Sequence, residues 1–152
     1  MNVFSGCWIS CLVLGASLAT AGGCAAGPVY VPSAQATPIA DGTYTAAQAD
    51  RGKLMYEQHC TTCHGSSLRG GANEFAAPAL AGPFFFETWS GRPVEELFRY
   101  TTENMPPDQP RLSDAAYLDL TAYVLQVLGY PVGSAELTAD APFMRRGIER
   151  QP

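Results

Sequence analysis

The sequence predicts a small all-α domain with long loops, extending from residue 45 to residue 129. Three segments carry helix signals: residues 46 to 59, residues 93 to 102 and residues 113 to 128. No convincing pair of strands and no internal repeat is present. A chain of 152 residues is expected to form one domain with appendages.

The first helix is expected to begin at Ala46, because Thr45 and Gln48 have the spacing of a capping box. It runs into the cysteine pair that starts at Cys60. Its predicted buried face carries residues at helical spacing: Ala49, Gly52, Met55 and Tyr56. Residues 65 to 91 are rich in glycine and alanine and contain Pro78 and Pro83, so we expect a loop there.

Pro93 suits the first position of a second helix ending near Thr102, and Glu95 and Glu96 would lie in its first turn. Ser113 can cap a last helix that reaches Leu128. Gly129 would stop that helix. The predicted buried stripe of the last helix consists of Ala116, Leu120, Tyr123, Val124 and Val127.

The charge pattern excludes one class of partner. The formal net charge is −5, and Lys53 is the only lysine beside eight arginines. Nucleic-acid binding requires a basic stripe, and the sequence shows none.

The N-terminal segment has the features of an export signal. No charged side chain precedes Asp41, and residues 7 to 19 form an apolar run of signal-peptide length. Small residues surround Cys24, as in lipoprotein signals, where the cysteine after the cleavage site is lipidated. Ala21, in place of the usual leucine, departs from that pattern. Cleavage after Ala21 and an uncleaved anchor are the alternatives. All three place the domain outside the cytoplasm.

The chain therefore divides into four predicted parts. Residues 1–23 form a signal peptide, residues 24–44 a tether rich in proline and alanine, residues 45–129 the domain, and residues 130–152 a C-terminal extension. The extension either wraps the domain or reaches a partner. We expect a bacterial periplasmic protein, tethered to a membrane by lipid or, alternatively, soluble.

The motif CTTCH, residues 60 to 64, carries the chemistry. A thioredoxin-like disulfide would need a βαβ setting, and a structural zinc site would need four ligands. The domain shows no βαβ pattern. It has only two cysteines, and its only other histidine, His59, cannot share a face with the motif, so zinc lacks ligands. On a helical turn, Cys60, Cys63 and His64 project on one side. The motif then predicts a c-type haem, with thioethers from both cysteines and His64 as an iron ligand.

A second iron ligand is expected from methionine. Met105 precedes Pro106, which favours an extended backbone, and Pro107 stiffens the segment. A rigid extended loop can hold a thioether against iron. Met55 lies on the helix of the motif and Met144 lies in the extension, so both are poorly placed. The alternative for Met105 is a gap-filling core residue.

With CTTCH, a downstream MPP and an aromatic last helix, residues 45 to 129 resemble a class I cytochrome c. The resemblance implies a small helical fold with long loops around one covalently bound haem. It implies that Gly52 and Tyr56 meet the last helix. It also implies that the Pro78 carbonyl accepts a hydrogen bond from His64, and that Trp89 and Arg92 lie near the haem propionates. Phe84, Phe85 and Phe86 would pack on the porphyrin or line its exposed edge, or else belong to the core.

More narrowly, GKLMYEQHCTTCHG and PALAGPFF resemble bacterial cytochrome domains that occur beside quinoprotein dehydrogenases. The function this implies is one-electron transfer between Fe(II) and Fe(III), without enzymatic activity of the chain itself. Donor and acceptor would be redox proteins: a dehydrogenase subunit, a terminal oxidase or a reductase. The competing functions are a haem peroxidase and a gas or redox sensor, both of which require Met105 to leave the iron.

Overall fold

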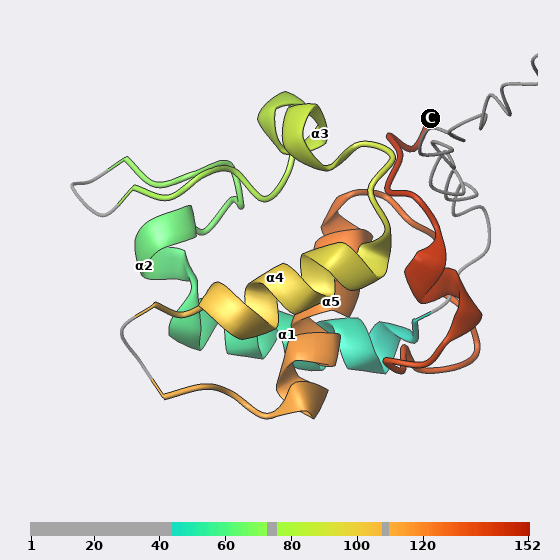
Figure 1. Cartoon of the computed structure of the whole chain (residues 1–152). Helices are drawn as coiled ribbons and strands as arrows, with labels where there is room; N and C mark the ends of the chain where they lie inside the picture. Colours follow the sequence, from blue (N-terminus) through green and yellow to red (C-terminus); the bar gives the residue numbers. More distant parts are fainter. Residues whose placement is uncertain (1–43, 73–75, 108–109) are drawn as a thin grey trace, which may run out of the picture. The chain divides into compact units, whose positions relative to one another are not determined.

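The computed structural model describes residues 44–72, 76–107 and 110–152. Within these residues the regular elements are helices, and extended pairing is limited to two isolated bridges. In chain order they are α1 (Ala46–His59), α2 (Thr61–His64), α3 (Pro83–Trp89), α4 (Val94–Asn104), α5 (Asp114–Val127) and the 3₁₀ helix η1 (Pro142–Arg145) (Figure 1). The predicted all-α class is confirmed.

One of the two hydrogen bonds of the predicted capping box is present at the start of α1. The Thr45 hydroxyl accepts a hydrogen bond from the Gln48 amide at 3.1 Å, as expected for the cap. The Gln48 side chain, however, does not return to Thr45. It is buried and pairs with the backbone of Leu137, donating to the carbonyl at 3.0 Å and accepting from the amide at 2.6 Å. A buried primary amide is stable only when its polar atoms are paired, and the C-terminal extension supplies that pairing.

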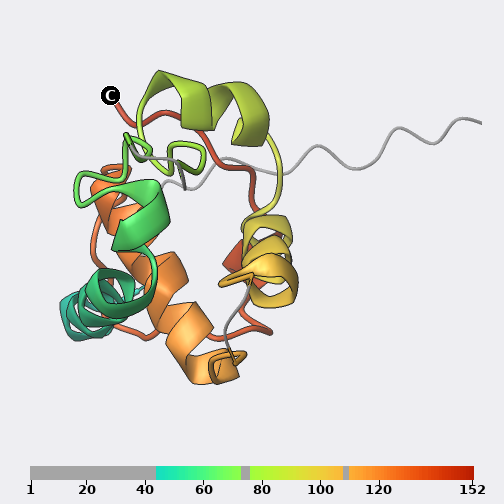
Figure 2. The ribbon, with the colours of Figure 1, turned by 90° about the vertical axis from the view of Figure 1, so that its left-hand side faces the viewer.

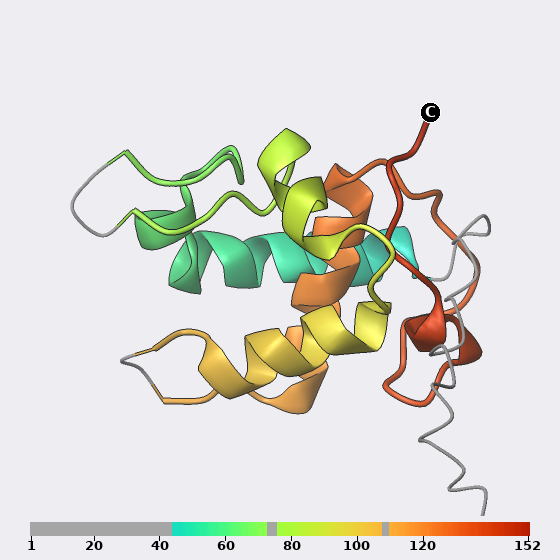
Figure 3. The ribbon, with the colours of Figure 1, turned by 45° about the horizontal axis from the view of Figure 1, so that its top comes forward.

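Helix α1 packs against α5 at Gly52, as the resemblance implied. A Cβ atom at this position would lie 1.9 Å from the backbone oxygen of Asp119, so only glycine fits the crossing. One turn later the rings of Tyr56 and Tyr123 meet with centroids 5.6 Å apart. Figure 3 shows the two helices crossing. The close backbone approach fixes the direction in which α1 delivers the CTTCH motif.

The loop predicted for residues 65–91 is wrong in its last third, where α3 forms. Gly82 has a φ of 83°, which suits glycine, and Pro83 follows at the first helical position. Phe85 and Trp89 are buried on the inner side of this helix, whereas Phe84 is 72% exposed. The phenylalanine run therefore has one core member, Phe85, one partly buried member, Phe86, and one surface member, Phe84. A helix this short has too few residues to show a periodic pattern, so only its packing reveals it.

Helix α4 begins one residue later and ends two residues later than predicted. Pro93 is the residue before Val94 rather than the first helical one, and Glu95 and Glu96 lie in the first turn. Val94 and Leu97 are buried. The backbone becomes extended at Met105 (φ −127°, ψ 141°), as expected for a residue before proline.

Helix α5 is buried on more sides than the predicted stripe. The Ser113 hydroxyl caps it by accepting from the Ala116 amide at 3.2 Å. Val127, placed in the stripe, is 39% exposed, so that prediction is wrong. The buried side chains of α5 are instead Tyr117, Leu120, Thr121, Ala122, Tyr123, Val124 and Leu125. Because α5 contacts both α1 and α4, a single stripe does not describe its packing.

The C-terminal extension wraps the domain. Leu137, Met144 and Ile148 are each at most 1% exposed. Residues 146 to 148 run along the connection between α3 and α4, and the amide of Ile148 donates to the Arg92 carbonyl at 2.9 Å. Of the two alternatives for this segment, wrapping the domain is the one observed (Figure 1).

Two functional segments lie at the same end of the fold. Helix α2 and the chain that leaves α4 are both at the left in Figures 1 and 3, and Figure 2 views the domain from that side. The predicted signal peptide and nearly all of the tether, including Cys24, lie outside the described residues. Among the helices that are described, none has the length and apolarity to span a bilayer.

Candidate functional site

The CTTCH motif forms a tight helical turn directly after α1. The amides of Cys63 and His64 both donate to the Cys60 carbonyl, at 3.2 and 2.9 Å. Gly65 ends the turn with a φ of 74°. Both cysteines are half-buried free thiols. The turn therefore brings the two sulfur-bearing residues and His64 together on one short element, as the spacing predicted.

The His64 ring is buried and held by one hydrogen bond. Its Nδ1 lies 2.8 Å from the carbonyl oxygen of Pro78. A carbonyl only accepts, so Nδ1 donates in this bond, and the neutral imidazole then has its lone pair on Nε2. A hydrogen-bond acceptor on the ring nitrogen that does not bind the metal orients a ligating imidazole and makes the other nitrogen a stronger electron donor. The contact implied by the resemblance is therefore present.

The loop after the motif is bonded to the motif itself. The Cys63 carbonyl accepts from the Ala77 amide at 2.9 Å, and the Tyr56 hydroxyl donates to the Gly65 carbonyl at 2.6 Å. Leu68 is 2% exposed, and its carbonyl accepts from the amides of Leu80 and Ala81. These bonds place Pro78 opposite His64. Leu68 was not among the predicted site residues, although a single large apolar residue in a stretch of small and polar residues was a usable signal.

Burial moves the pKa of the first thiol further above neutral pH, where a thiol at its ordinary pKa is already neutral. Desolvation, reinforced by the nearby Cys63, raises the pKa of Cys60 to about 11, so the group is a neutral thiol at neutral pH. Burial likewise raises the pKa of the neighbouring Tyr56. In the described part of the chain, no cluster of three or more His, Cys, Asp or Glu residues could hold a metal ion.

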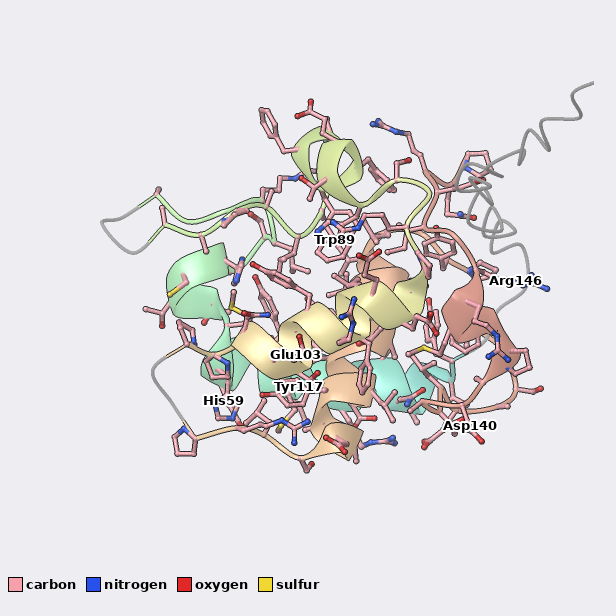
Figure 4. All side chains as sticks on the ribbon, viewed as in Figure 1. His59, Trp89, Glu103, Tyr117, Asp140 and Arg146 are labelled. Carbon is pink, nitrogen blue, oxygen red and sulfur yellow. The ribbon has the colours of Figure 1, made fainter. Side chains whose placement is uncertain are left out.

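Trp89 and Arg92 lie together, with partners that the sequence analysis did not name. The Arg92 guanidinium carbon is 4.2 Å from the centroid of the Trp89 ring. Its nitrogens donate to both carboxylate oxygens of Glu96, at 3.0 and 2.7 Å. This pairing with Arg92 lowers the pKa of Glu96. Figure 4 shows Trp89 between α3 and α4, where it also meets Tyr100 edge to face.

Met105 is half-buried at the point where α4 ends. Its amide donates to the Thr101 carbonyl at 3.0 Å, and the peptide bond to Pro106 is cis. It lines a hollow of about 180 Å³ together with Pro106, Pro107, Tyr117 and residues of the last turn of α4. Sequence reasoning overlooked Tyr117, although an aromatic with a polar tip in an apolar helix was a usable signal.

The remaining candidates lie elsewhere. Met144 is 1% exposed in η1 and belongs to the core. Met55 is half-buried and packs against the core. His59 is half-buried at the end of α1.

The residues present fit a covalently bound haem. Two free thiols three residues apart could form two thioethers, and the adjacent imidazole has its Nε2 lone pair available. A haem bound there would supply an iron centre that gains and loses one electron. The donor set lacks the four ligands of a structural zinc site.

Comparison with known proteins identifies the family. The family described as "Cytochrome C oxidase, cbb3-type, subunit III" matches residues 47–124. A curated relative, the cbb3-type cytochrome c oxidase subunit CcoP of Azospirillum brasilense, is 30% identical over 83 residues, which is 52% of this chain and 28% of the relative. The chain thus spans less than a third of that relative's length.

Two solved structures match this chain. The sulfane dehydrogenase SoxCD from Paracoccus pantotrophus matches with a TM-score of 0.52 at 20% identity, over 82% of this chain and 68% of that one. The thiosulfate dehydrogenase TsdBA from Marichromatium purpuratum matches with a TM-score of 0.42 at 28% identity, over 59% of this chain and 19% of that one. The first likeness agrees with a small all-α cytochrome c fold. The narrower likeness to domains beside quinoprotein dehydrogenases stays a prediction.

The family match covers more than half of the chain and includes the complete CTTCH motif, α4 and most of α5. The helical architecture and the paired thiols beside an oriented imidazole agree with it. The chain belongs to the family of cytochrome c oxidase, cbb3-type, subunit III, and is a c-type cytochrome electron carrier.

Proposed function

We propose that this chain is a monohaem cytochrome of the bacterial periplasm that passes single electrons between redox proteins. Cys60 and Cys63 would hold the haem covalently, and His64 and Met105 would be the axial ligands of its iron. The observation that carries the proposal is the His64 ring, buried beside both thiols and oriented by the Pro78 carbonyl at 2.8 Å. That arrangement prepares an imidazole to bind metal before the metal arrives.

Each residue of the site has one task in this function. The Pro78 carbonyl would hold the proton on Nδ1 of His64, which would leave Nε2 to bind the haem iron. The buried side chains around the motif exclude water, and a low-dielectric surrounding with a thioether ligand favours the reduced form. Trp89 and the ion pair of Arg92 with Glu96 would stand near the haem propionates. If His64 and Met105 both bind the iron, no site would remain for peroxide or oxygen.

The axial methionine is tested by Met105→Ala in the haem-loaded protein. The wild type is expected to show the weak red band of sulfur-to-iron ligation in its ferric spectrum and to bind no carbon monoxide when reduced. The variant should lose the band and bind carbon monoxide, because the sixth position is open. Met55→Ala is the matched control and should keep both wild-type properties.

A wild-type protein that lacks the band and binds carbon monoxide rapidly would contradict the proposal. It would favour the competing functions, a haem peroxidase or a gas sensor.

The partners proposed are a periplasmic dehydrogenase or oxidase complex. The relative from Azospirillum brasilense is named as an oxidase subunit, which favours delivery of electrons to a terminal oxidase. The alternative is the electron-accepting subunit of a quinoprotein or other dehydrogenase. Co-purification from native membranes, followed by identification of the attached redox subunit, distinguishes the two.

The N-terminus is proposed to tether the domain to a membrane through a lipid on Cys24. Mass spectrometry of the mature protein is expected to show a chain that begins at Cys24 and carries a diacylglycerol-type modification. A mature chain that begins at Gly22 without lipid would contradict the anchor and indicate a soluble periplasmic protein. An N-terminus at Met1 would indicate an uncleaved anchor.

A further inference from the structure

Tyr117 is buried beside the segment that carries Met105. The residue lies in the first turn of α5 and is 1% exposed. Its hydroxyl donates to the Met105 carbonyl at 2.6 Å and accepts from the Leu112 amide at 3.2 Å. Figure 4 shows Tyr117 close to the end of α4 that carries Glu103.

The Tyr117 hydroxyl thus forms hydrogen bonds with both ends of the loop between α4 and α5. Met105 is the first residue after α4, and Leu112 stands two residues before α5. Arg111 adds a second closure, because its Nε donates to the Thr102 carbonyl at 3.4 Å. Prolines stiffen a segment but do not attach it to anything. The buried Tyr117 hydroxyl attaches this loop to α5, and Arg111 adds a bond to α4.

We propose that Tyr117 is a positioning residue that keeps the Met105 thioether on the haem iron by anchoring the Met105 backbone. The inference rests on the proposed function, because it requires Met105 to be the axial ligand. A peptide group that is free to move allows its side chain to leave a ligand position, whereas a carbonyl bonded to a buried hydroxyl holds it. Thioether sulfur is a soft ligand that suits reduced metal ions, so the anchor matters most in the ferric state.

The chain contains a matched control for this hydroxyl. Tyr130 is also buried, and its hydroxyl also makes one bond to a carbonyl and one to an amide, both of Glu149 at 2.6 Å. Glu149 lies in the C-terminal extension. Tyr130→Phe therefore removes a buried hydroxyl and two hydrogen bonds of the same kinds as Tyr117→Phe does. It leaves the bonds to Met105 and Leu112 in place.

The experiment titrates ferric, haem-loaded full-length protein with imidazole, which competes for the sixth iron position. Tyr117→Phe is expected to lower the apparent Kd for imidazole about tenfold, the size expected for the loss of two neutral hydrogen bonds. It should also weaken the red sulfur-to-iron band and lower the reduction potential. Tyr130→Phe should leave the imidazole affinity, the band and the potential at their wild-type values.

Equal imidazole affinities in Tyr117→Phe, Tyr130→Phe and the wild type would overturn the inference while leaving the axial ligation intact. Absence of the red band in the wild type would overturn the ligation and this inference together. If Tyr117→Phe yields no folded protein, Leu112→Ala, which loses the partly buried leucine side chain but keeps the amide that donates to the hydroxyl, is compared with Leu112→Pro, which loses both. Leu112→Pro should lower the apparent Kd about threefold relative to Leu112→Ala, and equal Kd values in the two variants would overturn the inference.

Discussion

Replacing both Cys60 and Cys63 by alanine is expected to give a chain without covalent haem and with little folded protein. Denaturing gels stained for haem should show no signal at the mass of the chain, because no thioether can form. Circular dichroism of any purified material should show a loss of helix. The physical reason is the size of the core: small domains often need a bound group to complete it, and a ligand that binds only the folded state stabilises that state.

Ser66→Ala is the matched control for this pair. Ser66 is exposed just beyond the same turn, so the variant should attach haem and fold as the wild type does. A haem-stained band from the double alanine variant would contradict the assignment of the attachment residues. A normal yield of folded, colourless protein would contradict only the stabilising role of the haem.

A chain that ends at Gly129 is expected not to fold, although the predicted domain ends there. Truncation removes five buried apolar side chains: Tyr130, Leu137, Phe143, Met144 and Ile148. Burial of five such side chains stabilises by on the order of 10 kcal/mol, which is comparable to the whole stability of a small domain. The cut also leaves the buried Gln48 amide without both of its Leu137 partners. Thermal unfolding of the haem-loaded protein and its yield measure the effect.

A chain that ends at Glu149 is the control for the truncation. It keeps all five buried side chains and the Tyr130 bonds to Glu149, and it loses only Arg150, Gln151 and Pro152. Its unfolding temperature should stay within a few degrees of the wild type. A chain ending at Gly129 that folds and unfolds like the wild type would show that the extension contributes nothing to the core.

The sequence alone predicted those parts of the fold that depend on near neighbours. The Thr45 and Ser113 caps bond to amides three residues away, and the extended backbone at Met105 follows from the proline after it. The spacing of the CTTCH motif places its three chemical groups on one turn through bonds within five residues. Local sterics and local hydrogen bonds decide such features, so a sequence pattern is sufficient to find them.

Only the tertiary structure decided the features that join distant segments. The Gln48 side chain bonds to the Leu137 backbone instead of the predicted capping partner, because a buried amide must pair with the polar groups that packing places next to it. Tyr117 meets the carbonyl of Met105 across the loop between two helices. The extension became part of the core because Leu137, Met144 and Ile148 find apolar surface on elements far away in the chain. The energies of such contacts depend on which segments meet in space, and no local pattern of residues records that.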